Sequence, residues 1–207
     1  MALTKIDVCN HALLKVGADT IASLDVSAST AEGTIQTARL CNILFDQALE
    51  ETMRIYTWNC CTRRAIPVKL SAAPAFGHKF AFQLPNDALR IINVFNNTNQ
   101  YDDGIRWVLE GREILCDYDV IYLKYVAKPS NIGTLDPLAT QALICNLALK
   151  LSIPLHLDND MHSQILQELE QVVLPRARSI DTFENKELLL EESNWILSRS
   201  VDTPLVG

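Results

Sequence analysis

The chain has 207 residues, 48% of them hydrophobic and 21% charged, with a formal net charge of −7 at pH 7. A chain of this size buries roughly 70% of its unfolded surface, so it needs no disulfide or metal to fold. The acidic balance argues against a surface that grips nucleic acid by its phosphates. No apolar run reaches the roughly 18 residues of a membrane span, and the polar start, with Lys5 and Asp7, predicts no signal peptide.

Two amphipathic helices are predicted before residue 61. In residues 4–16 the apolar positions are three and four apart, as on one helical face: Ile6, Cys9, Leu13 and Val16. Residues 30–57 predict a longer helix, roughly 40 Å at 1.5 Å per residue. Its expected apolar stripe comprises Ile35, Ala38, Cys41, Phe45, Ala48, Thr52 and Ile55. The cysteines on these faces are interpreted as reduced core residues.

Residues 62–128 change to short segments rich in aromatic and branched residues, separated by Pro, Gly, Asn and Asp. Such segments are typical of strands: AIPVKL, KFAFQL, ALRIINVF, RWVLEG, REILCD and VIYLKYVAK. Gly111 predicts a tight turn between two paired strands. Residues 96–104 predict a polar loop at a hairpin tip.

Helical patterns return after residue 128. Asp136 followed by Pro137 predicts an N-cap with proline at the first helical position. The segment LATQALICNLALKLS is apolar on most sides, so we expect a central, buried helix. A last amphipathic helix is predicted over 159–181, which Pro175 should kink or deprive of one hydrogen bond. Its expected stripe comprises Met161, Ile165, Leu169, Val172, Val173, Arg176 and Ile180.

These elements predict a mostly helical α+β protein. Residues 1–61 and 129–181 are expected to form a four-helix bundle. Residues 62–128 would be a β-sheet module inserted between the second and third helices, and residues 182–207 an extended C-terminal arm. The arm contains apolar residues of the kind that anchor interfaces: Leu188, Leu189, Leu190, Trp195, Ile196 and Leu197.

The stretch YTWNCCTRR, residues 56–64, is the first candidate for chemistry. Adjacent cysteines rarely bond to each other, because the ring is strained, and Cys60-Cys61 lacks a second ligand pair at zinc-site spacing. We therefore interpret the stretch as a structural joint, in which Trp58 and a cysteine pack where the helix meets the first strand. Arg63 or Arg64 should bond to a nearby acid or carbonyl. The alternative is a reactive thiolate activated by these arginines.

Other chemical patterns are weak. His156 and His162 with Asp158 and Asp160 fail the spacing of a calcium loop and of a helical zinc pair, so a polar turn between helices is preferred over a metal site. Carboxylates that could serve hydrolysis are Glu50, Glu51, Asp102, Asp103, Glu110, Glu113, Asp117 and Asp119. No phosphate-binding glycine loop, G-x-S-x-G or H-E-x-x-H occurs. No cofactor and no metal are expected.

Several stretches in order resemble phage head-to-tail adaptor proteins of the tail tubular protein A type. They are IDVCNHALLKVGADTIASLD, YTWNCCTRRAIPVKL, FAFQLPNDALRIINVF, RWVLEGREILCD, IYLKYVA and LDPLATQALICNLALKLS. The resemblance covers roughly residues 3–181. Its most specific parts are Trp58 with Arg64, the Leu84-Pro85 and Leu89-Arg90 pairs around Asp87, Glu110-Gly111 and the helix start at Asp136. Residues 182–207 match no motif of the family.

The resemblance implies a structural, non-enzymatic protein of the virion, assembled in the host cytoplasm. Such subunits form a twelve-membered ring that joins the portal protein to the tail nozzle protein, with tail fibres as a further partner. Genome DNA would pass through the ring without specific binding, and no membrane anchor is expected. The alternative function is a tail-associated peptidoglycan hydrolase that uses acids of the β module.

Overall fold

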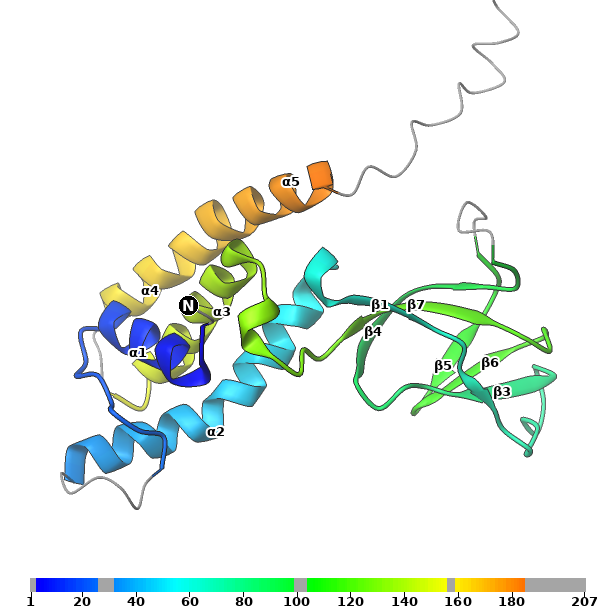
Figure 1. The fold of residues 1–207 in the computed structure, drawn as a ribbon, viewed down its shortest axis with the longest axis horizontal. Helices are drawn as coiled ribbons and strands as arrows, with labels where there is room; N and C mark the ends of the chain where they lie inside the picture. The colour runs from blue at the N-terminus through cyan, green and yellow to red at the C-terminus, as the bar shows by residue number, and fades with distance from the viewer. Residues whose placement is uncertain (1–2, 26–31, 99–103, 156–158, 185–207) are drawn as a thin grey trace, which may run out of the picture.

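The computed structural model describes residues 3–25, 32–98, 104–155 and 159–184. Helices lie at one end of the molecule and strands at the other (Figure 1), which confirms the α+β class. The helices are α1 (Lys5–Lys15), α2 (Glu32–Ile55), α3 (Pro137–Ser152), α4 (Asn159–Glu168) and α5 (Leu174–Glu184). The π-helical turn Leu169–Val173 joins α4 to α5.

Local sequence determines where two of the helices begin. Thr4 and Asp7 form a capping box at α1, in which the Thr4 hydroxyl accepts from the Asp7 N–H at 3.3 Å and the Asp7 carboxylate accepts from the Thr4 N–H at 2.9 Å. The Asp136 carboxylate accepts from the Leu138 N–H at 2.8 Å and starts α3 as expected, with Pro137 at its first position.

The helix α3 lies at the centre of the helical part. It contacts α1, α2, α4 and α5, and most of its side chains are buried, as its all-round apolar pattern predicts. Cys9 and Cys41 are buried among these helices, which confirms their interpretation as core residues, and Cys145 of α3 is buried there as well. The expected place of Ile55 on the buried stripe is wrong. Its side chain is 47% exposed, because α2 ends there and Trp58 covers the core in its place.

The π turn changes which residues of α5 face the core. Pro175 has no N–H to donate to the preceding turn, and the wider π turn lies directly before it. One extra residue in a turn rotates the following helix, so Ala177 and Asp181 are buried. Arg176 and Ile180, the positions expected from an unbroken period of 3.6, are exposed.

The strands form two antiparallel sheets. β1 (Thr62–Ala65), β7 (Tyr122–Ala127) and β4 (Ala88–Phe95) make one sheet in the order β1-β7-β4. The other has the order β2-β3-β6-β5, with β2 (Val68–Lys69), β3 (Phe80–Gln83), β6 (Glu113–Cys116) and β5 (Val108–Glu110). Phe82, Ile114 and Leu123 belong to the small core of this β part.

Two turn predictions had different outcomes. Gly111 lies between β5 and β6, which pair as expected, and its φ of 59° is in the left-handed region that favours glycine. The hairpin tip expected at residues 96–104 is wrong. β4 pairs with β7 and β5 with β6, so this segment links the two sheets. Alternating apolar residues specify strands but not their partners.

Candidate functional site: a joint and a cationic hollow

Trp58 fills the space where the helices meet the strands. Its side chain is 1% exposed and belongs to the helical core. Its indole N–H donates to the Thr52 carbonyl at 2.9 Å, and the Tyr56 ring meets it edge-on with 5.2 Å between ring centroids. A buried indole with a satisfied N–H is a structural anchor. The expected burial of Trp58 is confirmed.

The chain around Trp58 is also bonded to α5. The Asn59 N–H donates to the Asp181 carboxylate at 3.0 Å, and the Asn59 amide donates to the Asp181 carbonyl at 2.7 Å. Tyr56 Oη lies 3.3 Å from Thr182 Oγ1. These bonds connect residues more than 120 positions apart, so they fix the start of the β part to the last described helix.

The two adjacent cysteines have different environments. Cys61 is buried, and its Sγ lies 3.2 Å from the Met53 sulfur, whereas Cys60 is exposed. The sulfurs are 3.9 Å apart, and both thiols are free. The Cys61 thiol lowers the pKa of Cys60 to about 7, while the contact with Cys60 and burial raise the pKa of Cys61. Cys61 packs in the joint, which confirms the expectation that one of the two cysteines packs there, while Cys60 faces solvent.

Arg63 meets an acid, as expected. Its guanidinium donates to Asp87 at 3.0 Å, and the Tyr125 hydroxyl donates to the other oxygen of the same carboxylate at 3.2 Å. Burial and the Asp87 charge raise the pKa of Tyr125. The Lys128 N–H donates to the Asp87 carbonyl at 2.7 Å. Asp87 therefore links β1, β7 and the turn before β4.

The second half of α2 contacts the same sheet. The Arg54 guanidinium donates to the Leu89 carbonyl at 3.1 Å, and Lys128 Nζ lies 2.8 Å from Glu50. We use the name joint for residues 56–63 and their bonded partners, together with these two contacts between α2 and the β part. The joint attaches the β part along α2, not through a single linker.

Sequence reasoning missed the partners of the joint. Asp181 lies in a region where the predicted stripe was displaced by the π turn, and nothing in its sequence context indicates burial. Desolvation raises its pKa above the ordinary value of 3.8. Lys128 follows β7 directly, and a lysine at the end of a strand is usually solvated, so its sequence context does not indicate the ion pair with Glu50 of α2. These partners are distant in sequence, so only the fold brings them together.

The other candidate residues that the structure describes have separate partners. The His162 ring nitrogen Nδ1 lies 2.7 Å from the Ser152 hydroxyl, and His156 and Asp158 lie outside the described residues, as do Asp102 and Asp103. Asp119 pairs with Lys69, and Asp117 accepts from the Lys79 N–H at 3.1 Å. Within the part of the chain that the structure describes, no His, Cys, Asp and Glu side chains are grouped as metal ligands.

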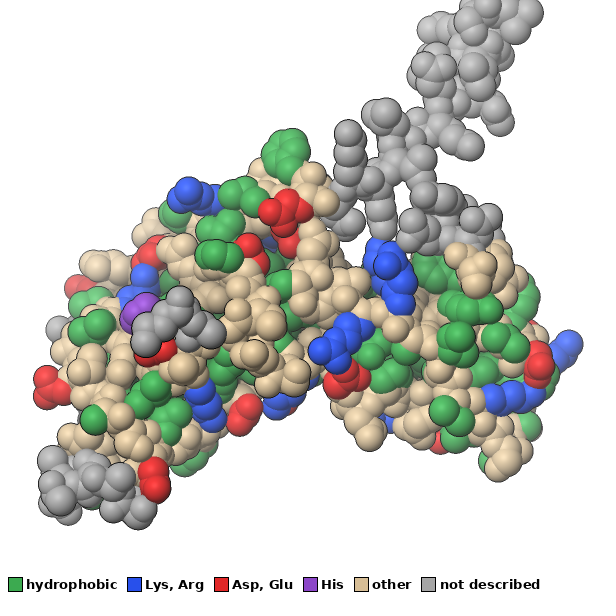
Figure 2. All heavy atoms as spheres, in the orientation of Figure 1, with side chains coloured by type: hydrophobic (Ala, Val, Ile, Leu, Met, Phe, Trp, Pro, Cys, Tyr) green, Lys and Arg blue, Asp and Glu red, His purple; other side chains and the backbone are tan. Residues whose placement is uncertain are grey.

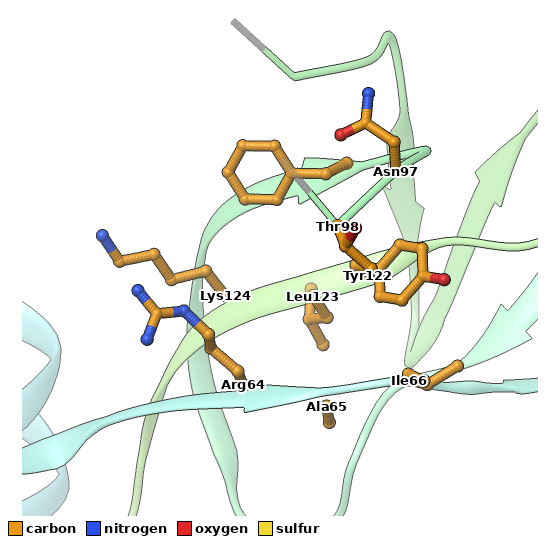
Figure 3. A pocket seen from close by; sticks show the side chains of 9 residues that line it. Arg64, Ala65, Ile66, Asn97, Thr98, Tyr122, Leu123 and Lys124 are labelled. Atoms are coloured by element: carbon orange, nitrogen blue, oxygen red, sulfur yellow. The ribbon is translucent and has the colours of Figure 1, made fainter. Parts of the chain in front are cut away.

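A hollow of about 480 Å³ lies on the sheet β1-β7-β4. Arg64 and Lys124 extend together at one end of it, and Ile66 and Tyr122 lie at the other (Figure 3). We call this surface the cationic hollow; it is lined by Arg64, Ala65, Ile66, Phe95, Asn97, Thr98, Tyr122, Leu123 and Lys124. Arg64, expected in the joint, belongs to this surface instead, because alternate strand residues face opposite sides.

Apolar side chains are also exposed on both parts of the molecule (Figure 2). In the β part, Ile66, Val68 and Phe76 are prominent, Phe76 being 89% exposed. In the helical part, the face that the π turn rotates outward carries Val172, Ile180 and Phe183. Exposed apolar patches of this kind mark surfaces for protein contacts. The arm residues Leu188 to Leu190 and Trp195 to Leu197 lie outside the described residues.

Comparison with known proteins assigns no family. No protein-family model and no curated protein sequence matches the chain. Among the described helices, none combines the length and the apolar character that crossing a bilayer requires.

Proposed function

We propose that this protein is a structural adaptor of a phage virion, which forms a ring of twelve copies between the portal protein and the tail nozzle protein. The ordered sequence resemblance suggests this function. The joint is the observation that supports it best, because an adaptor must hold two contact-making parts in a constant relative position. Arg54, Lys128 and Asn59 each connect the two parts by polar contacts.

In this proposal the helices form a four-helix bundle that closes the ring, and the β part is a module for further contacts. A closed ring uses two different patches on each subunit. The outward face of α5, with Ile180 and Phe183, and the β patch around Phe76 lie on different parts of the molecule and are exposed. They are candidates for the two patches. The arm, residues 182–207 in the sequence prediction, would attach to the portal, although Thr182, Phe183 and Glu184 are helical.

The proposal includes a passage for DNA that does not bind it. Twelve copies at −7 each amount to −84, and a wall of that sign repels phosphate. Duplex DNA should therefore show no salt-sensitive binding to the ring. Tight binding that weakens as salt is added would contradict this aspect of the proposal.

The mass of the assembly tests the proposal. The full chain is mixed with the portal protein encoded in the same genome, and the complex is measured by native mass spectrometry. Twelve copies of 23.2 kDa amount to about 280 kDa, so the portal mass should increase by this amount. A variant with Phe183→Ser and Ile180→Ser should lower the copy number if the α5 face closes the ring. A portal mass that does not change would overturn the proposal.

A further inference from the structure

The cationic hollow combines charge and apolar surface on one face of a sheet. Arg64 lies directly opposite Lys124 in the pairing of β1 with β7, and Phe95 lies opposite Tyr122 in the pairing of β4 with β7. Residues directly opposite on paired strands share a face. The hollow therefore has two cations at one end, and Tyr122 and Ile66 at the other (Figure 3).

Each end of the hollow favours a different chemical group. Like charges opposite each other on a sheet are destabilising, and a carboxylate placed between Arg64 and Lys124 would offset this with charge-assisted hydrogen bonds. Both cations also have interactions elsewhere in the chain, so such a carboxylate would share them. At the other end, Ile66 is 65% exposed, and covering it removes apolar surface from water.

A peptide with acids followed closely by large apolar residues matches this arrangement. β1 runs away from the joint, so Arg64 is nearer the joint than Ile66 is. The chain contains a matching segment after α5, where Glu191 and Glu192 precede Trp195, Ile196 and Leu197. Laid parallel to β1, this segment would place its acids at the cations and Trp195 over the apolar end.

The segment begins close enough to reach the hollow of its own chain. Asn59 and Asp181 are hydrogen bonded, so α5 ends beside the segment that leads into β1. Five residues from Asn59 to Arg64 span at most ~17 Å, whereas seven residues from Glu184 to Glu191 reach up to ~25 Å. A short connection of this kind gives a high effective concentration, which favours binding within one chain.

We propose that residues 191–197 bind in the cationic hollow of their own chain, with Glu191 and Glu192 at Arg64 and Lys124 and Trp195 against Ile66 and Tyr122. The arm is then stored on the β part until a partner with a stronger site displaces it. This inference does not depend on the proposed ring, because it concerns the isolated subunit.

The test follows Trp195 in the full chain. The chain has three tryptophans, so 5-fluorotryptophan is incorporated and the ¹⁹F signal of Trp195 is assigned with Trp195→Phe. A neutral gadolinium chelate then broadens exposed signals. In the unaltered chain the Trp195 signal should stay sharp. In the Glu191→Lys/Glu192→Lys variant the Trp195 signal should broaden as much as it does in urea. Adding Arg64→Glu/Lys124→Glu to that variant reverses both charges of the contact and should make the Trp195 signal sharp again.

Controls separate this site from its alternatives. Lys79→Glu removes an exposed cation of the β part outside the hollow and should leave the signal sharp. The Glu191→Lys/Glu192→Lys variant changes only residues outside the described fold, so it remains informative if Arg64→Glu/Lys124→Glu fails to fold. A Trp195 signal that is broadened in the unaltered chain, or insensitive to charge reversal, would overturn the proposal. Protection that disappears on dilution would assign the site to the arm of a second copy and also overturn it.

Discussion

The helical part and the β part bury apolar surface in different ways. The helices pack around α3, and side chains from α1 to α5 contribute to their shared core. The short strands divide into two sheets around a smaller core, and Ile66, Val68 and Phe76 remain exposed. Both parts expose apolar side chains, so the difference lies in the size of the core that supports each surface: large under the helices and small under the strands. The joint determines whether the two behave as one unit.

The largest expected effect comes from removing the anchor of the joint. Trp58→Ala should lower the free energy of unfolding by about 3–5 kcal/mol, because it leaves a cavity and an unpaired Thr52 carbonyl. Urea unfolding followed by circular dichroism measures this loss. Trp58→Phe is the matched control, which keeps an aromatic ring and should lose less. If Trp58→Ala unfolds only the β part and leaves the helices at their original midpoint, the two parts are not one cooperative unit.

A smaller effect is expected at Asp181. Asp181→Ala removes the acceptor of the Asn59 N–H and should cost about 1–3 kcal/mol. Asp181→Asn keeps an acceptor oxygen and removes the buried charge, so it should cost less at pH 7. Thermal unfolding of both variants gives the comparison, and equal losses would show that the charge matters more than the hydrogen bond.

The same residue predicts a pH dependence. Burial raises the pKa of Asp181 above 3.8, so the folded state holds the proton more tightly than the unfolded chain. Its contribution to stability is therefore present below pH 3.8 and is lost as pH rises through the folded-state pKa. Asp181→Asn should flatten this range of the stability curve. A curve with an unchanged slope there would contradict the raised pKa.

The exposed ion pair of the joint should matter less. Arg63 and Asp87 are both partly in solvent, and such pairs contribute roughly 0–1 kcal/mol. Arg63→Met should therefore shift the urea midpoint slightly. Asp87→Ala should shift it more, since it also removes the acceptor of Tyr125. A double-mutant cycle with Tyr125→Phe separates the two contacts, and a loss from Arg63→Met as large as that from Trp58→Ala would contradict the stated ranking.

The smallest effect on stability is expected at Cys60, although its chemistry is distinct. With a pKa of about 7 and an exposed thiol, Cys60 should react with iodoacetamide at neutral pH, whereas the buried Cys61 should not. Peptide mapping by mass spectrometry identifies the modified thiol, and Cys60→Ser is the control. Assembly should survive modification, because Cys60 does not pack in the joint. Modification of Cys61 first would show that the joint opens readily.

The sequence predicts the helices of this protein better than the contacts between its parts. The cap at Thr4, the Asp136-Pro137 start and the all-round apolar pattern of α3 depend on neighbouring residues, so they can be read locally. The partition of strands into two sheets depends on pairings between distant segments. The π turn before Pro175 shifts the buried positions of α5 by one residue. A prediction that assumes a constant helical period of 3.6 residues places the buried face on the wrong side chains.

The candidate site was predictable to a similar extent. The burial of Trp58, and a polar partner for either Arg63 or Arg64, follow from their place between a helix and a strand, but which arginine binds which partner does not. The roles of Asp181 and Lys128, and the placement of Arg64 beside Lys124, arise only when segments far apart in the chain meet. Cys60 and Cys61 are consecutive residues of the 3-10 turn Asn59–Cys61, which buries the second side chain and leaves the first exposed, and the sequence alone does not show which of the two is buried.

Under the proposed adaptor function, electron microscopy of phage particles assembled with this chain tests the central claim most directly. The adaptor account predicts a ring of twelve copies between portal and tail nozzle, into which α2, α3 and the β part fit as one body held by the contacts of the joint. Particles without this chain at the head-to-tail junction, or with the helical and β parts in a variable relative position from subunit to subunit, would contradict it.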